Sequence, residues 1–195
     1  MRVKTDERRR AIMDAATELF HEVGYERASM AGISARVGGS KQTLYSYFKS
    51  KEELFAAAMV ASMEERGYQL IDLLDPATTD LRATLERFGT AYLDFIADPE
   101  LVRNNRVAIG AAGGLGAQLY QLGPRRLWGE ITGYLQTRID AGQLTAPSAT
   151  IAGLHLQGLL EAGYAEALLF GAPAEIDKAK AVAAGIDVFF KAYGA

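Results

Sequence analysis

Apolar side chains recur along this chain at the spacing of an α-helix, and this periodicity limits the fold more than any other feature of the sequence. In residues 12–23 they fall on one helical stripe, formed by Ile12, Ala15, Ala16, Leu19, Phe20 and Val23. Similar patterns cover 30–37, 41–48, 50–74, 80–97, 99–111, 115–122, 124–142, 149–170 and 174–192, and strand-like alternation is not found. We therefore predict an all-α protein.

Capping residues mark where several of these helices begin. Ser29 and Ser40 each precede a short apolar-periodic segment, and a serine hydroxyl there accepts a hydrogen bond from a free amide of the first turn. Ser50 and Glu53 form a Ser-x-x-Glu capping box before the segment that runs to residue 74. Pro124 suits the first position of the helix that follows it.

Basic residues concentrate near the N-terminus although the whole chain is acidic. Residues 1–51 carry ten Lys/Arg against six Asp/Glu, a balance of +4, whereas the other 144 residues have a balance of −7 and the chain a net charge of −3. A basic first quarter on an acidic body indicates a polyanionic partner for one end of the molecule.

Residues 29–48 have the dimensions of a helix-turn-helix, with two short helices joined at Gly38-Gly39. In the second helix Leu44 and Phe48 are four residues apart and form the face to be buried. This helix is about 12 Å long at roughly 1.5 Å per residue, which fits a DNA major groove about 12 Å wide. Its outward side chains are Lys41, Gln42, Thr43, Tyr45, Ser46 and Tyr47.

These outward side chains suit the reading of double-stranded DNA. The amide of Gln42 can pair with the edge of an adenine, which makes it the best candidate for base recognition. The tyrosines can donate to phosphates while packing against the groove wall. Lys51, in the first turn of the next helix, adds a positive charge for a phosphate.

A distinctive set of residues spans positions 15–54: Ala15-Ala16, Leu19-Phe20, Gly24-Tyr25, Ser29-Met30, Ile33, Gly38-Gly39-Ser40, Thr43-Leu44-Tyr45, Tyr47-Phe48, Ser50-Lys51-Glu52 and Leu54. This set resembles the DNA-binding domain of the tetracycline-repressor (TetR) family. The resemblance covers about residues 8–57, and TLYSYFKSKEEL is its most distinctive segment. The chain departs from the family pattern at Ser34, Val37, Gly39 and Gln42. The first three concern packing, and Gln42 lies on the reading face, where it would alter the preferred operator.

The resemblance implies how the two parts of the chain divide their roles. Residues 1–50 would form the helix-turn-helix domain, and 51–195 a helical ligand-binding and dimerisation domain. Lys41 and Gln42 would lie near bases. The remaining DNA-facing residues would lie near phosphates: Ser29, Thr43, Tyr45, Tyr47 and Lys51. A TetR-type repressor of this kind binds a palindromic operator as a homodimer and leaves it when a small effector binds. Residues 123–144 and the Ala-rich helix after them also resemble, loosely, the branch that controls efflux genes.

The effector would contact aromatic and polar side chains of the middle helices, because such pockets are mostly apolar with a few polar anchors. Any one of these side chains could equally be an ordinary core residue. The candidates are Tyr68, Phe88, Tyr92, Phe95, Asn104, Tyr120, Trp128, Tyr134 and His155.

The segment 149–170 is apolar on nearly all sides, which predicts burial on all sides. A membrane span is disfavoured because the segment holds Glu161 and Glu166, and an acid at mid-membrane costs about 2.5–3.5 kcal/mol. We expect a cytoplasmic protein with no membrane contact.

A partner copy would cover the outer face of this segment. The last helix would join the same interface through Val182, Ile186, Phe189, Phe190 and Tyr193. The alternative is an internal core helix.

Catalysis is not predicted. The chain has no cysteine, so thiolate metal sites and cysteine nucleophiles are excluded, and only two histidines could serve as metal ligands or as general acids and bases. The single Glu18-x-x-His21 lacks the second copy that a di-iron bundle needs, and the glycines near residue 113 complete no phosphate loop. We expect no cofactor and no metal. Two alternatives stay open: an interaction protein whose helix-turn-helix contacts protein, and an activator in place of a repressor.

Overall fold

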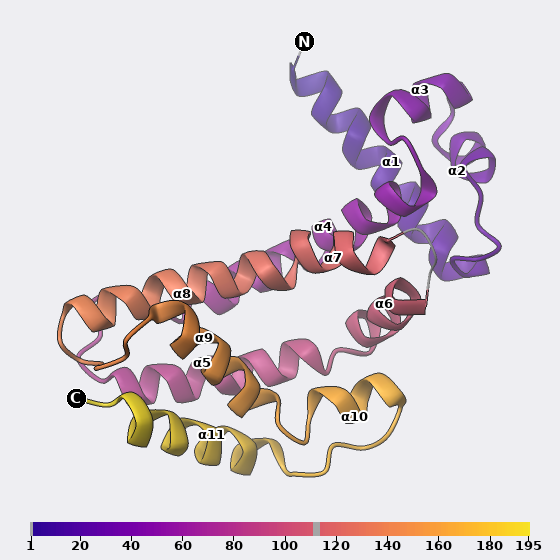
Figure 1. Cartoon of the computed structure of the whole chain (residues 1–195). Helices are drawn as coiled ribbons and strands as arrows, with labels where there is room; N and C mark the ends of the chain where they lie inside the picture. The colour runs from indigo at the N-terminus through magenta and orange to yellow at the C-terminus, as the bar shows by residue number, and fades with distance from the viewer. Residues whose placement is uncertain (1, 111–113) are drawn as a thin grey trace. The chain divides into compact units, whose positions relative to one another are not determined.

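The computed structural model describes residues 2–110 and 114–195 (Figure 1). Within these residues it contains eleven helices, joined mostly by short turns, and this confirms the all-α prediction. The helices are α1 (Arg2–Val23), α2 (Met30–Val37), α3 (Lys41–Tyr47), α4 (Lys51–Asp72), α5 (Leu81–Ile96), α6 (Pro99–Gly110), α7 (Leu115–Leu122), α8 (Pro124–Asp140), α9 (Ala149–Glu161), α10 (Ala165–Phe170) and α11 (Lys178–Tyr193). Among the described residues, no helix combines the length and the apolar character that crossing a membrane requires.

The chain packs into two compact units, whose limits differ from the predicted border after residue 50. The first unit holds residues 1–64 and 107–123, and the second holds 65–106 and 124–195. Helices α4 and α6 therefore contribute to both units. The division of roles between 1–50 and 51–195 stays a prediction, because packing alone does not assign a role to a segment.

The first unit is built around one apolar cluster from α1, α2, α3 and the start of α4. Phe20, Tyr25 and Phe55 form its aromatic centre, with ring centroids 4.9–5.8 Å apart. Residues of α6 and α7, Ala108 and Leu115 among them, belong to the same cluster. The three N-terminal helices are therefore packed, together with parts of α4, α6 and α7, around a core separate from that of the second unit.

The predicted helix starts are largely confirmed. The Ser29 and Ser40 hydroxyls accept from the amides of Gly32 and Thr43, at 3.1 and 3.0 Å, as N-caps do. Pro124 is the first residue of α8.

The capping box before α4 is half formed. The Ser50 hydroxyl accepts from the Glu53 amide at 3.1 Å, as predicted. The Glu53 carboxylate accepts from the amide of Lys49 at 2.8 Å, one residue earlier than a capping box requires.

The second unit has a separate core between α5, α8, α9 and α11. Leu85, Phe88, Ile131, Leu156 and Phe189 are among its fully buried members. Helices α5 and α9 approach closely at a glycine of α5. A β-carbon added to Gly89 would lie 2.9 Å from a methyl of Leu160 in α9, so a larger residue would require the buried Leu160 side chain to shift.

The prediction of one helix over 149–170 is wrong. The chain forms α9 and α10 instead, and the break lies at Gly163, whose φ is +70°. A left-handed residue cannot continue an α-helix, and glycine adopts that conformation without strain. Helix α11 also begins later than predicted, because Asp177 caps the amides of Ala179 and Lys180.

The apolar stripe of the last helix faces inward and does not form an outer face. Val182, Ile186 and Phe189 are 4%, 0% and 0% exposed in the core of the second unit. The outward side of α11 carries Val188, which is 48% exposed. The prediction that Val182, Ile186 and Phe189 contact a partner copy is therefore wrong, because these side chains are buried within the second unit. Dimerisation itself stays a prediction.

Candidate DNA interface and effector site

Helix α3 holds its polar face outward because its apolar face is anchored in the core. Leu44 and Phe48 are 2% and 0% exposed, as the four-residue spacing predicts. On the opposite side Lys41 and Gln42 are exposed, and Tyr45 is 44% exposed. These three side chains can reach a ligand outside the protein without any rearrangement of α3.

The hydroxyl residues around α3 have local partners. Thr43 and Ser40 share a hydrogen bond of 2.9 Å between their hydroxyl oxygens, and the Ser46 hydroxyl donates to the Thr43 carbonyl at 2.7 Å. The Ser29 hydroxyl is the N-cap of α2. Tyr47 is half-buried against the first unit's core. These contacts fix the helix ends. The phosphate contacts of Ser29, Thr43 and Tyr47 and the DNA-facing role of Ser46 stay predictions.

Lys51 is bound within the protein. Its ammonium donates to the carbonyls of Tyr25, Ala28 and Glu26, at 2.9, 3.3 and 3.5 Å, and lies 4.2 Å from the centroid of the Tyr25 ring. The structure thus assigns Lys51 to the loop between α1 and α2, which it ties to the start of α4. No local pattern in the sequence indicates this role, because the partners are more than twenty residues away.

An ion pair joins α1 to α2. The Arg36 guanidinium donates two hydrogen bonds to the Glu22 carboxylate, at 3.0 and 2.5 Å. The hydrogen bond from Arg36 holds the pKa of the Glu22 carboxyl below its usual value. Arg36 is therefore neutralised within the protein and is not a free positive charge for DNA.

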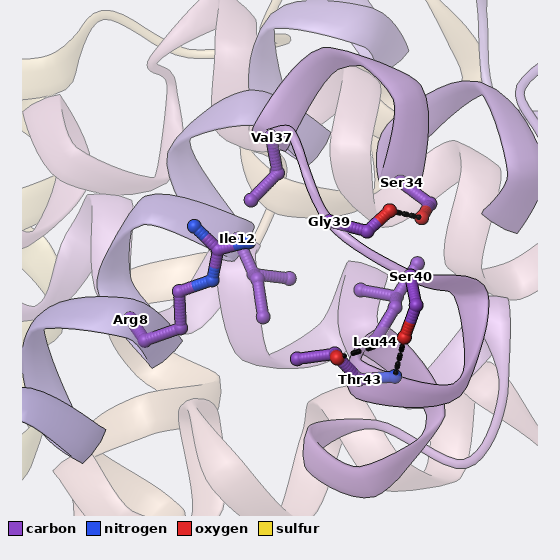
Figure 2. Close-up of a pocket in the computed structure, with 8 residues that line it drawn as sticks. All are labelled: Arg8, Ile12, Ser34, Val37, Gly39, Ser40, Thr43 and Leu44. Carbon is purple, nitrogen blue, oxygen red and sulfur yellow. Dashed lines mark hydrogen bonds between the residues drawn. The ribbon is translucent and has the colours of Figure 1, made fainter.

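A small recess lies between α1 and the α2–α3 turn (Figure 2). Its lining includes Arg8 and Ile12 from α1, Val37 and Gly39 at the turn, and Thr43 of α3. The Arg8 guanidinium donates to the carbonyl of Gly38, at 2.6 Å. We refer to this feature below as the α2–α3 recess.

In the second unit, three of the predicted effector residues form one buried aromatic cluster. The ring centroids of Phe88, Tyr92 and Trp128 are 5.2–6.1 Å apart, with Trp128 edge-on to the other two. All three are less than 10% exposed. Trp128 donates its indole N–H to the Tyr92 hydroxyl at 3.2 Å.

A second hydrogen bond joins the Tyr92 hydroxyl to Glu161 of α9, an acid that the sequence analysis did not propose as a site residue. The hydroxyl donates to the Glu161 carboxylate, and Gln157 donates to the same oxygen at 2.9 Å. Burial raises the pKa of Tyr92 well above its ordinary value, and the charge of Glu161 raises it further. The only sequence signal was the four-residue spacing of Gln157 and Glu161, which puts both on one helical face.

The remaining effector candidates do not gather at this cluster. Phe95 and Tyr134 pack in or against the same core, and His155 is exposed on α9, bonded through Nδ1 to the Tyr193 hydroxyl at 2.5 Å. Tyr68 and Tyr120 are each 52% exposed, and Tyr120 belongs to the first unit.

Two buried polar atoms of the second unit have no hydrogen-bond partner among the described residues: Asn104 Nδ2 and the Tyr134 hydroxyl. Asn104 is 5% and Tyr134 9% exposed. Unpaired buried polar groups are uncommon and call for an explanation. Both are among the predicted effector contacts.

Comparison with known proteins agrees with this architecture. Residues 12–58 match the family model described as bacterial regulatory proteins, tetR family, and residues 83–195 match that of the AefR-like transcriptional repressor C-terminal domain. The HTH-type transcriptional activator FasR of Mycolicibacterium smegmatis is 38% identical over 95 residues, which cover 49% of this chain and 43% of FasR. The chain thus spans less than half the length of this relative.

Solved structures match over nearly the whole chain. A TetR-family regulator from Mesorhizobium loti has a TM-score of 0.81 at 24% identity, covering 97% of this chain and 98% of that one. The flavonoid-responsive regulator FrrA has a TM-score of 0.75 at 26% identity, with the same coverage. The fold and the exposed α3 define a helix-turn-helix transcription regulator with a helical second unit. The chain belongs to the TetR family of bacterial regulatory proteins. Control of efflux genes stays a prediction.

Proposed function

We propose that this chain is a ligand-responsive repressor that binds a palindromic operator as a homodimer and is released by a small, largely apolar effector. The observation that carries the proposal is helix α3, whose polar face is exposed while its apolar face is fixed in a separate core. A DNA reader of this kind acts in the cytoplasm beside the chromosome, and the role requires no catalysis.

Base reading is assigned to Lys41 and Gln42, the two exposed residues at the start of α3. A glutamine amide can bond adenine at two points and a lysine can bond guanine, whereas Tyr45 and the hydroxyl residues suit phosphates. The retention of this polar face argues against the alternative of a protein-contact module, which has no need of such side chains.

Dimerisation is assigned to the outward sides of α9 and α11. Ile151 and Leu154 on α9 are 46% and 60% exposed, and Val188 on α11 is 48% exposed. Exposed apolar side chains on two helices that pack against each other favour a self-complementary interface. A two-fold dimer would place its recognition helices about 34–36 Å apart, the spacing of successive major grooves.

The effector is assigned to the second unit, near Tyr92 and Glu161. The aromatic cluster offers apolar contact, and the Tyr92 hydroxyl and the Glu161 carboxylate are polar groups bonded beside it. The second unit also holds two buried polar groups without a partner among the described residues, the Asn104 amide nitrogen and the Tyr134 hydroxyl. FrrA, similar over most of its length, is a flavonoid-responsive regulator, which supports a small-molecule response in this chain. We expect binding to favour a dimer whose helices no longer match the operator.

The direction of regulation is proposed from the C-terminal match to an AefR-like repressor domain. FasR is an activator, so whether this protein represses or activates transcription needs a direct test. A reporter gene behind the chain's own upstream DNA should be expressed more strongly when the regulator gene is deleted. Lower expression on deletion would make the protein an activator.

Operator binding is tested with a fluorescent duplex of the same upstream DNA and a scrambled duplex, each at two salt concentrations. Binding should weaken steeply with salt, because neutralised phosphates release counterions. Gln42→Ala should lose about 1–3 kcal/mol on the specific duplex only. Gln69→Ala, an exposed glutamine of the second unit, is the matched control and should bind normally. Absence of salt-dependent binding to any duplex would refute DNA reading and favour the protein-contact module.

The effector is then sought by release from DNA, with a panel of flavonoids and other aromatic phenols as probes. A compound that releases the wild type should act more weakly on Tyr92→Phe, because that variant loses the hydroxyl that joins Trp128 to Glu161. Equal release of both proteins would place the effector away from this cluster.

A further inference from the structure

Arg8 of α1 reaches across thirty residues of sequence to the turn before the recognition helix. Its Nη2 donates to the carbonyl of Gly38 at 2.6 Å, and the side chain lines one wall of the α2–α3 recess (Figure 2). This side-chain hydrogen bond joins α1 directly to the turn. The turn is therefore held from outside the helix-turn-helix pair itself.

The Arg8 guanidinium lies where a side chain at residue 39 would begin. A β-carbon on Gly39 would lie 2.6 Å from Arg8 Nη2 and 3.8 Å from Cζ, and the shorter distance is closer than real β-carbons approach another atom. Backbone conformation does not explain this glycine, since Gly38 has a φ of +69° but Gly39 is not among the positive-φ residues. A side chain at this position would instead displace the Arg8 guanidinium.

The same turn is held a second time, from α2. The hydroxyl of Ser34, a buried side chain, donates to the Gly39 carbonyl at 3.1 Å. The next residue, Ser40, is the N-cap of α3. Arg8 and Ser34 thus bond two successive carbonyls immediately before the recognition helix, and any shift of these carbonyls moves the start of α3 and with it Gln42.

We propose that Arg8 is a positioning residue for DNA reading: its guanidinium clamps the α2–α3 turn in the place that a side chain at residue 39 would occupy. The proposal rests on the proposed DNA-binding function and goes beyond it, because Arg8 acts through the orientation of α3. It also makes Gly39 a part of the reading apparatus, although glycine offers nothing for DNA to contact.

The opposing explanation is that Arg8 simply binds a phosphate, and the two explanations differ in salt dependence. A phosphate contact weakens all duplexes alike when removed, and lowers the salt slope by about one per protomer, or about two for a dimer. A lost clamp reduces specific affinity and leaves both the salt slope and the affinity for scrambled DNA unchanged.

The experiment is a double-mutant cycle with Arg8→Ala, Gly39→Ala and the double variant. Each single change should lower affinity for the specific duplex about 3- to 10-fold, as expected for loss of an exposed charged hydrogen bond. The double variant should be no worse than Arg8→Ala, because alanine at residue 39 then meets no guanidinium. In the Arg8→Ala background, Gly39→Ala should leave the free energy of unfolding unchanged or raise it slightly, since alanine restricts the unfolded chain more than glycine does.

Arg10→Ala is the control for charge, because it removes an exposed arginine from the same helix. It should leave the ratio of specific to scrambled affinity unchanged. Arg8→Lys should restore part of the specific affinity, since an ammonium can still donate one bond to the Gly38 carbonyl.

The clamp would be refuted if Arg8→Ala and Gly39→Ala had additive effects on the affinity for the specific duplex. It would also be refuted if Arg8→Ala weakened binding to the specific and scrambled duplexes equally and lowered the salt slope. Thermal unfolding of the same four proteins gives a readout without DNA, in which the two positions should again be coupled. If the wild type binds no duplex, the proposed function fails, but coupling or additivity in the unfolding cycle still decides whether the clamp exists.

Discussion

Replacement of Lys51 by methionine should destabilise the first unit by about 2 kcal/mol. The ammonium makes two hydrogen bonds of 3.3 Å or less to carbonyls and lies over the Tyr25 ring. Hydrogen bonds from a charged group contribute about 1.5–3 kcal/mol each, but Lys51 is partly exposed, so we take roughly half of the lower figure for each bond. The cation–π contact adds about 0.5 kcal/mol. Methionine keeps most of the stem, so packing changes little.

The assay is urea unfolding at pH 7, followed by far-ultraviolet circular dichroism and by tryptophan fluorescence. The single tryptophan, Trp128, lies in the second unit, so its fluorescence reports that unit separately. Lys51→Met should shift the circular dichroism transition, and the fluorescence transition less or not at all if the units unfold independently. Lys49→Met, at an exposed lysine two residues earlier, should change the free energy of unfolding by less than about 0.5 kcal/mol. An equally small change for Lys51→Met would refute the structural role and favour the phosphate contact.

Three further outcomes are expected. Asp98 accepts hydrogen bonds from Arg66 and two amides of α6, and although burial alone would raise its pKa, these bonds lower it. The free energy of unfolding should therefore fall as the pH drops from about 5 through the folded pKa of Asp98, and less steeply in Asp98→Asn, as measured by urea titrations at several pH values. Leu154→Arg should convert dimer to monomer in sedimentation experiments, whereas Thr90→Arg, exposed on α5, should not. Gly89→Ala should cost about 1–3 kcal/mol of unfolding free energy by overpacking the contact between α5 and α9, while Gly129→Ala, whose β-carbon meets nothing within 4 Å, should not destabilise the protein. Equal effects of Leu154→Arg and Thr90→Arg would contradict the proposed dimer interface, and equal effects of the two glycine substitutions would contradict the close contact between α5 and α9.

Local signals predicted much of the first unit. Ser29 and Ser40 act within three residues of themselves, and Leu44 and Phe48 follow helical spacing, so their roles can be inferred from neighbours in sequence. The same local signals did not predict the break at Gly163. An apolar run with glycines is compatible with a continuous helix, and the sequence does not reveal which glycine adopts a positive φ.

Contacts between distant residues could not be predicted in this way. The hydrogen bond of Tyr92 with Glu161 spans 69 residues, and that of Arg8 with Gly38 spans 30. Both depend on the packing of helices, which periodicity does not specify. The candidate effector residues illustrate the limit, because three of them meet in one cluster while Tyr68, a residue of the same type, is exposed.

The same distant contacts change what the N-terminal charge means for DNA binding. If every basic side chain of residues 1–51 met a phosphate, a dimer would neutralise twenty, and the slope of log K against log salt would be about −18. Five of those side chains bind groups of this chain instead: Arg8, Arg9, Arg27, Arg36 and Lys51. Among the other described side chains of this segment, three basic ones are exposed without a bonded partner, namely Arg10, Lys41 and Lys49. Three per protomer predict a slope of about −5. A slope steeper than about −10 would mean that the bonded arginines exchange their partners for phosphates, and would contradict a turn held by Arg8 in the bound state.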